Sequence, residues 1–104
     1  EALGAEIVFK VLIDELVLKK DFKKIDKADQ LKIIKTIRKK LTTKPEEFGK
    51  PLKGELKGYW KLRIGEFRVI YEIKRDKIIV YVIMVGYRRD KEAYKKAIIR
   101  LGLK

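Results

Sequence analysis

The stretch GYWKLRIGEFRVIYEI, residues 58–73, concentrates basic side chains on one face of a predicted β-hairpin. Apolar and polar residues alternate along it, as in two strands joined by a tight Gly-Glu turn. In that register Arg63 and Arg68 lie directly opposite each other, and Lys61 lies one step along the same face. Like charges in such positions destabilise a strand pair. We therefore expect the cluster to bind an anion that relieves the repulsion.

Arginine at these positions indicates that the anion is a phosphate. The chain otherwise prefers lysine, and the planar guanidinium fork fits phosphate oxygens better. Arg88, just past the end of the following predicted strand, lies beside the same sheet and extends the cluster. A solvated sheet face in a lysine-rich protein also carries such cations. Composition and patterning alone leave both interpretations open.

The overall charge of the chain also indicates a polyanionic partner. Lysine and arginine number 28 against 15 acidic residues in a chain of 104, which gives a net charge of +13. A nucleic acid, an acidic protein or an anionic membrane surface would match this excess. No apolar run reaches transmembrane length and no secretory signal is visible, so we expect a cytoplasmic protein.

Histidine and cysteine are both absent from the chain. This excludes disulfides and thiolate catalysis, and it removes the usual acid–base residue and the commonest metal ligand. It also excludes nucleases that rely on paired histidines. We predict that the protein uses no metal and no cofactor.

The hydrophobic pattern predicts one small α+β domain with the element order β-α-α-β-β-β-α. The expected sheet is antiparallel and packs on a helical hairpin, with a further helix at the C-terminus. The predicted elements are a strand at 9–14, helices at 15–25 and 28–43, strands at 58–64, 67–74 and 77–85, and a helix at 89–103. Residues 1–8 fit no later pattern and form a predicted N-terminal extension of the domain at 9–104.

Apolar spacing predicts which face each helix buries. The expected stripes are Leu18, Phe22 and Ile25 in the first helix and Leu31, Ile34, Ile37 and Leu41 in the second. Asp14 is placed to cap the first helix, and Asp90 to begin the last one. The strand IIVYVIMV is apolar at every position, so we expect both of its faces to be covered, with Gly86 at its end.

The segments KPLKGELKGYWKLRIGEFRVIYEI and VIMVGYRRDKEAY resemble the RelE branch of the RelE/ParE toxin superfamily. The resemblance extends over about residues 9–101 and agrees with the predicted element order. It implies a toxin of a type II toxin–antitoxin system, neutralised by a cognate, RelB-like antitoxin. It also implies a metal-independent endoribonuclease that enters the ribosomal A site, cleaves mRNA there and inhibits translation. The expected form is a monomer or a toxin–antitoxin hetero-oligomer.

The family pattern carries over to particular residues of this sequence. The residues it implies to be catalytic are Lys61, Arg68, Arg88 and Tyr94. The flanking cations expected to bind RNA are Arg63, Lys53 and Arg89. Lys61 and Arg63 compete for one position of the pattern. Some relatives carry a further lysine near the start of the first hairpin strand, where this chain has Tyr59 or Trp60.

The implied reaction is attack of a ribose 2′-hydroxyl on the adjacent phosphate. Arg68 and Arg88 would hold the phosphate and stabilise its developing charge. Lys61 is a candidate base, because crowding by neighbouring cations disfavours its charged form. Tyr94 either stacks on a base or assists proton transfer, or it is a structural tyrosine that packs on the sheet. Without histidine, much of the rate is expected from positioning of the RNA by the ribosome.

Two other functions remain open from the sequence. The main alternative is a ParE-like toxin that inhibits DNA gyrase without nuclease activity, because the same fold supports both activities. The other is a basic RNA-binding module without catalysis. The implied catalytic set favours the nuclease, since the gyrase-directed branch generally lacks it. The lysines of the two helices either contact rRNA phosphates, with salt-dependent affinity, or form a solvated face.

Overall fold

A five-stranded sheet with the strand order β1-β5-β4-β3-β2 is the central layer of the protein. The computed structural model describes residues 7–103, so residues 1–6 of the predicted N-terminal extension lie outside the described residues. The strands are β1 (Lys10–Ile13), β2 (Lys50–Pro51), β3 (Tyr59–Ile64), β4 (Phe67–Lys74) and β5 (Ile79–Tyr87). The helices are α1 (Glu15–Lys19), α2 (Lys27–Lys40), α3 (Pro45–Phe48) and α4 (Ala93–Arg100), with 3-10 turns η1 (Asp21–Lys24) and η2 (Gly54–Leu56).

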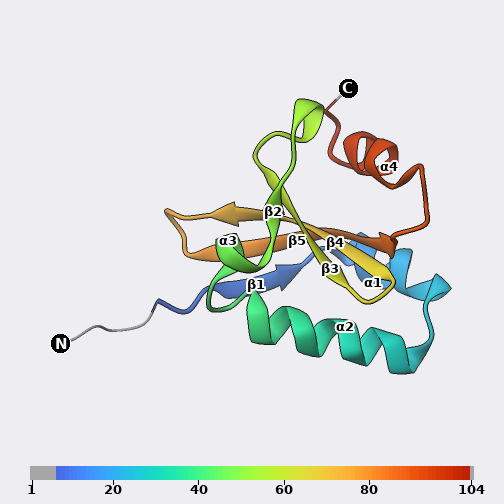
Figure 1. Ribbon diagram of the computed structural model, residues 1–104, viewed down its shortest axis with the longest axis horizontal. Helices are drawn as coiled ribbons and strands as arrows, with labels where there is room; N and C mark the ends of the chain where they lie inside the picture. Colours follow the sequence, from blue (N-terminus) through green and yellow to red (C-terminus); the bar gives the residue numbers. More distant parts are fainter. Residues whose placement is uncertain (1–6, 104) are drawn as a thin grey trace.

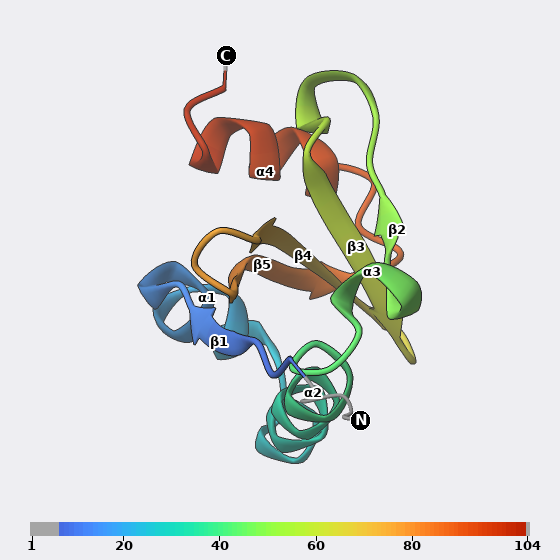
Figure 2. The same ribbon diagram turned by 90° about the vertical axis from the view of Figure 1, so that its left-hand side faces the viewer.

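Helices cover both faces of the sheet, with α2 on one side and α4 on the other (Figures 1 and 2). The larger core lies on the side of α1 and α2 and includes the buried Val17, Ile37 and Val82. The smaller core lies under α4 and includes Ile70 and Ala97. Among the described residues, none of the helices is long and apolar enough to cross a membrane. The predicted α+β class is confirmed.

The sheet differs from the expected antiparallel one at its first strand. The β3–β4 and β4–β5 pairs are antiparallel, as predicted, whereas β1 pairs with β5 in parallel. Short turns force consecutive strands to run antiparallel. Most of the domain separates β1 from β5, so no turn fixes their relative direction.

A further edge strand, β2, lies outside the prediction. It contains only Lys50–Pro51, which pair with Lys61 and Trp60 of β3. Proline is tolerated at this position because one side of an edge strand makes no ladder hydrogen bonds. The chain enters β2 through Gly49, where a Cβ atom would collide with the hydroxyl group of Tyr71. Close packing therefore requires glycine at the start of β2.

The hairpin of β3 and β4 has the predicted register. Arg63 pairs with Arg68, and Lys61 pairs with Ile70. The first turn residue, Gly65, has a φ of 57°, and the second turn residue is not at positive φ, as in a type II′ turn. The apolar residues that alternate with the cations face the larger core. The basic face of the hairpin consequently points toward the side of α4.

Two helical faces differ in part from the predicted stripes. In α2, Ile33 joins Ile37 in the core, whereas Leu31 is 68% exposed. Successive helical residues turn by about 100°, which places Leu31 about 160° around the helix from Ile33 and therefore on the solvent side. Leu18 is 52% exposed and Val17 is buried instead. The predicted first helix ends early and continues as the 3-10 turn η1, whose tighter winding breaks the expected spacing, so the helical hairpin is asymmetric.

A β-bulge in β5 changes which side chains face α4. Ile70 of β4 pairs with Met84, and Tyr71 pairs with Val82, so Ile83 is the extra residue. The insertion shifts the alternation, and both Ile83 and Met84 contribute to the smaller core. Both faces of β5 are covered, as the apolar sequence predicts.

The C-terminal elements begin later than predicted. β5 continues through Tyr87 instead of ending at the preceding glycine, and α4 begins only after an intervening turn. In this turn the carboxylate of Asp90 accepts hydrogen bonds from the Lys96 ammonium and from the main-chain N–H of Glu92, both at 2.9 Å. These contacts, with Lys96 the larger cause, lower the pKa of Asp90. Asp90 thus stabilises the turn before α4 and is not the residue at which this helix begins.

A largely buried ion pair between Asp21 and Arg100 closes the edge of β5 where β1 has ended. The Arg100 guanidinium contacts both carboxylate oxygens of Asp21 at 2.8 and 2.9 Å and donates to the carbonyl of Ile83 at 3.0 Å. Asp21 also accepts from the main-chain N–H of Val85 at 2.9 Å. The pair raises the pKa of Arg100, chiefly through its hydrogen bond to Asp21. It satisfies the main chain at the bulge and ties α4 to η1.

Replacing Arg100 by alanine is expected to destabilise the fold by about 3 kcal/mol, because it leaves Asp21 buried and unpaired. The measurement is the free energy of unfolding in urea. Lys19→Ala is the control, since Lys19 forms a mostly exposed pair with Glu15, and it should cost less than about 1 kcal/mol. Equal losses for the two variants would contradict this role of the buried pair.

Candidate phosphate-binding site

Four cations gather at one end of the sheet, on the face that α4 covers only in part. Lys61 and Arg63 come from β3, Arg68 comes from β4, and Arg88 directly follows β5. We call these four residues the cation row. Within residues 7–103, none of them forms an ion pair with a carboxylate. Their charge is therefore available to an external anion.

Arg68 lies at the centre of the cation row and is half-buried. Its Nη2 donates to the main-chain carbonyl of Arg88 at 3.3 Å. Its Nε is buried and has no hydrogen-bond partner in the described part of the chain. A guanidinium group has five N–H donors, so most of the donor capacity of Arg68 remains unused. The side chain is held in position with N–H groups left for an anion.

Tyr94, on the first turn of α4, covers part of the cation row. Its ring centroid lies 4.7 Å from the guanidinium carbon of Arg68 and 5.9 Å from Nζ of Lys61. Attraction between a cation and an aromatic face is worth roughly 0.5–1 kcal/mol at exposed sites and more when water is excluded. The tyrosine thus offsets part of the repulsion between the two cations, and α4 brings it into the site.

Arg88 is fixed to the tip of the β3–β4 hairpin. Its main-chain N–H donates to the carbonyl of Glu66 at 2.8 Å, and its Nη1 donates to the carbonyl of Gly65 at 3.3 Å. The guanidinium group is exposed and faces the turn that joins Arg63 to Arg68. The four cations predicted from the sequence therefore come together from three strands.

The remaining predicted RNA contacts lie at different distances from the cation row. Arg89 adjoins it, but its guanidinium lies 3.6 Å from the carboxylate of Glu66 and 4.4 Å from the ring centroid of Tyr87. Lys53 lies near the start of β3, where the neighbouring Leu52 N–H donates to the carbonyl of Tyr59 at 2.9 Å. The cation row begins at Lys61, in the middle of that strand, and extends toward its other end. RNA binding by Lys53 stays a prediction, and it would involve the start of β3, away from most of the cation row.

Gly86 leaves an open space beside Arg68, which could not be predicted from the sequence. We call this space the open floor. It pairs directly with Arg68 across β4 and β5. A Cβ atom built at Gly86 would meet no other atom within 4 Å. Its φ is not positive, so neither the backbone nor packing requires glycine there. The missing side chain leaves space next to the guanidinium, which suits an approaching phosphate.

The arrangement of fold and site defines a small, basic α+β protein with an unpaired cluster of cations on one end of its sheet. A family profile described as the ParE toxin of type II toxin–antitoxin systems, parDE, matches residues 15–92. A protein of Escherichia coli described as RelE-like is 32% identical over 83 residues, which cover 79% of this chain and 86% of that protein. The chain belongs to the RelE/ParE superfamily of type II toxins, in its RelE-like branch, as the sequence motifs predicted.

Two further relatives support this assignment. The mRNA interferase toxin RelE of Escherichia coli is 39% identical over 41 residues, which span 39% of this chain and only 43% of RelE. A mutant of the same toxin in the free state has a matching fold, with a TM-score of 0.65 and 25% identity over 90% of this chain and 98% of that one. A chain of a RelBE toxin–antitoxin complex from Mycobacterium tuberculosis matches with a TM-score of 0.68 and 25% identity, over 79% of this chain and 100% of the matched chain.

Substitutions at Gly86 test whether the open floor belongs to the site. Gly86→Ala should leave both the stability and the affinity for RNA nearly unchanged, whereas Gly86→Leu should fill the space beside Arg68 and weaken RNA binding on the order of tenfold or more. The measurements are thermal unfolding and fluorescence anisotropy with a labelled single-stranded RNA. Normal RNA affinity in a folded Gly86→Leu protein would show that the floor is not part of the site.

Proposed function

We propose that this toxin is a ribosome-dependent endoribonuclease that cleaves mRNA. The observation that carries the proposal is the meeting of Arg68 and Arg88 beside Lys61 and Tyr94, where neither arginine pairs with a carboxylate of residues 7–103. The named activity of RelE from Escherichia coli, an mRNA interferase, supports the same reaction class.

The proposed reaction is an internal transfer at one phosphodiester. The ribose 2′-oxygen forms a bond to phosphorus, and the bond from phosphorus to the 5′-oxygen of the next nucleotide breaks. The products are a 2′,3′-cyclic phosphate and a 5′-hydroxyl end. Arg68 and Arg88 donate hydrogen bonds to the non-bridging oxygens, where negative charge develops. The neutral amine of Lys61 accepts the 2′-hydroxyl proton, and Tyr94 supplies a proton to the leaving oxygen. Arg63 competes with Lys61 for this position of the family pattern, but its guanidinium group does not deprotonate and would only donate hydrogen bonds to the phosphate.

The open site is the reason why the proposal includes the ribosome. Lys61 and Arg68 are only half-buried, while Arg63 and Arg88 are exposed, so the chain itself encloses little of a bound RNA. Correct alignment of the 2′-oxygen, the phosphorus and the leaving oxygen contributes much of the rate in such reactions. A ribosome-bound mRNA supplies that alignment. The exposed lysines of α2 are available for rRNA phosphates.

An antitoxin is the second proposed partner. The structures with similar folds include a RelBE complex from Mycobacterium tuberculosis and the intact RelBE complex of Escherichia coli. In this chain, the unpaired cation row is the surface that an acidic segment of an antitoxin would neutralise. Covering Arg68 and Arg88 would exclude the phosphate and silence the toxin.

Arg88→Ala is expected to reduce cleavage on the order of 100-fold, because it removes one preorganised donor to the phosphate. The measurement maps mRNA ends in a translating extract, where the unmodified chain should produce codon-periodic cuts. Lys77→Ala, in the exposed turn between β4 and β5, is the control and should cut normally.

The same assay, run beside a DNA gyrase supercoiling assay and an RNA-binding assay, can overturn the nuclease. Intact mRNA together with blocked supercoiling by DNA gyrase would instead assign a ParE-like activity. RNA binding with neither effect would reduce the chain to a binding module. Cuts that persist unchanged in Arg88→Ala would remove Arg88 from the site.

A further inference from the structure

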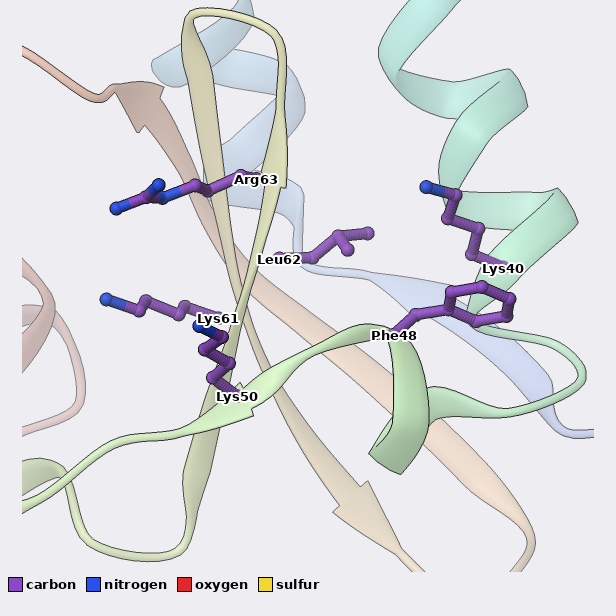
Figure 3. Close-up of a pocket in the computed structure, with 6 residues that line it drawn as sticks. All are labelled: Lys40, Phe48, Lys50, Lys61, Leu62 and Arg63. Atoms are coloured by element: carbon purple, nitrogen blue, oxygen red, sulfur yellow. The ribbon is translucent and has the colours of Figure 1, made fainter.

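A second basic groove lies on the reverse side of β3 from the cation row. It is a cavity of about 190 Å³. The residues that line it are Lys40, Phe48, Lys50, Lys61, Leu62 and Arg63. We call it the β3 groove. Figure 3 shows that Leu62 points toward Phe48 and Lys40, whereas the side chains of Lys61 and Arg63 point to the other side of the strand.

The β3 groove is open because β2 is too short to cover it. The pairing of β2 with β3 is limited to Trp60 and Lys61. From Leu62 onward, no strand in the described part of the chain pairs with this edge of β3. The edge therefore leaves main-chain groups of Arg63 accessible between the groove and the cation row.

The chemistry of the β3 groove suits one nucleotide of a single-stranded RNA. Phe48 is 45% exposed, and Nζ of Lys40 lies 5.3 Å from its ring centroid. Lys40 and Lys50 form no ion pair within residues 7–103. Proteins that bind single strands combine such cations, which contact the backbone, with aromatic rings on which bases stack.

The acidic side chains closest in sequence do not neutralise the β3 groove. Glu46 and Glu47 precede Phe48 on α3. Glu46 forms an ion pair with Arg75, and Glu47 lies 4.0 Å from Nζ of Lys44. None of the residues that line the groove is acidic. The groove therefore has no acidic lining residue, and it meets the cation row along the strand at Lys61 and Arg63.

We propose that the β3 groove binds the nucleotide next to the scissile phosphate. The RNA crosses the free edge of β3 at Arg63, stacks a base on Phe48 and places a phosphate at Lys40. This inference rests on the proposed function, since it extends the substrate strand away from the cation row. Continuity with that row and the exposed aromatic ring favour RNA over an acidic peptide as the occupant.

The test measures binding of a short, labelled single-stranded RNA that carries 2′-O-methyl groups and so cannot be cleaved. Phe48→Ala should weaken binding on the order of tenfold, and Phe48→Trp should retain it, because stacking on an aromatic ring is what is lost. Lys40→Gln should reduce the slope of log affinity against log salt by about 0.7, the share of one phosphate contact. Lys39→Gln is the matched control, since Lys39 is exposed and next in sequence but does not line the groove.

Two outcomes would overturn the groove as an RNA site. One is that Phe48→Ala and Lys40→Gln, with normal unfolding midpoints, bind RNA like Lys39→Gln. The other is that they lose affinity for polyglutamate while keeping it for RNA, which would make the groove a docking surface for an acidic protein. Because the readout is binding, a lack of mRNA cleavage would leave the groove standing. Normal RNA binding by the variants would leave the nuclease standing.

Discussion

The opposition of Arg63 and Arg68 across β3 and β4 is the constraint on which the site depends. A cross-strand pair of like charges costs roughly 0.2–1 kcal/mol. Burying one aliphatic side chain contributes roughly 1.5–3 kcal/mol, and Leu62, Ile64 and Val69 are all buried on the opposite face of the same hairpin. A slip by one residue would expose them. The core therefore fixes the register, and the arginines stay together although they repel each other.

Contacts near both of its ends hold α4 on the sheet. Tyr94 lies over Arg68 only while α4 rests on the sheet, and the largely buried pair of Asp21 and Arg100 holds the other end of this helix. That pair also satisfies main-chain groups at the bulge of β5. The ion pair that completes the fold thus also helps to position the ring of Tyr94 at the site.

Sequence reasoning succeeded where the determining contacts are local. The hairpin register follows from the alternation of apolar and polar residues and from one turn. The helix cap at Asp14 follows from the position of this residue directly before the helix, and its carboxylate accepts from the N–H of Leu16 at 3.1 Å. It failed where contacts between segments far apart in the sequence determine the structure. Nothing in the pattern links Asp21 to Arg100 or reveals the bulge at Ile83 and the parallel pairing of β1. The cations of the hairpin could be placed for the same local reason, whereas the open space at Gly86 depends on the neighbouring strand.

The account rests on a phosphate docking at the guanidinium groups of Arg68 and Arg88. Side-chain NMR of these arginines during titration with an uncleavable 2′-O-methyl RNA tests this most directly. The account predicts that the guanidinium resonances of both residues shift together and saturate at one RNA per chain. Resonances that stay unchanged while those of the lysines on α2 move would contradict it, because the RNA would then bind elsewhere on the charged surface.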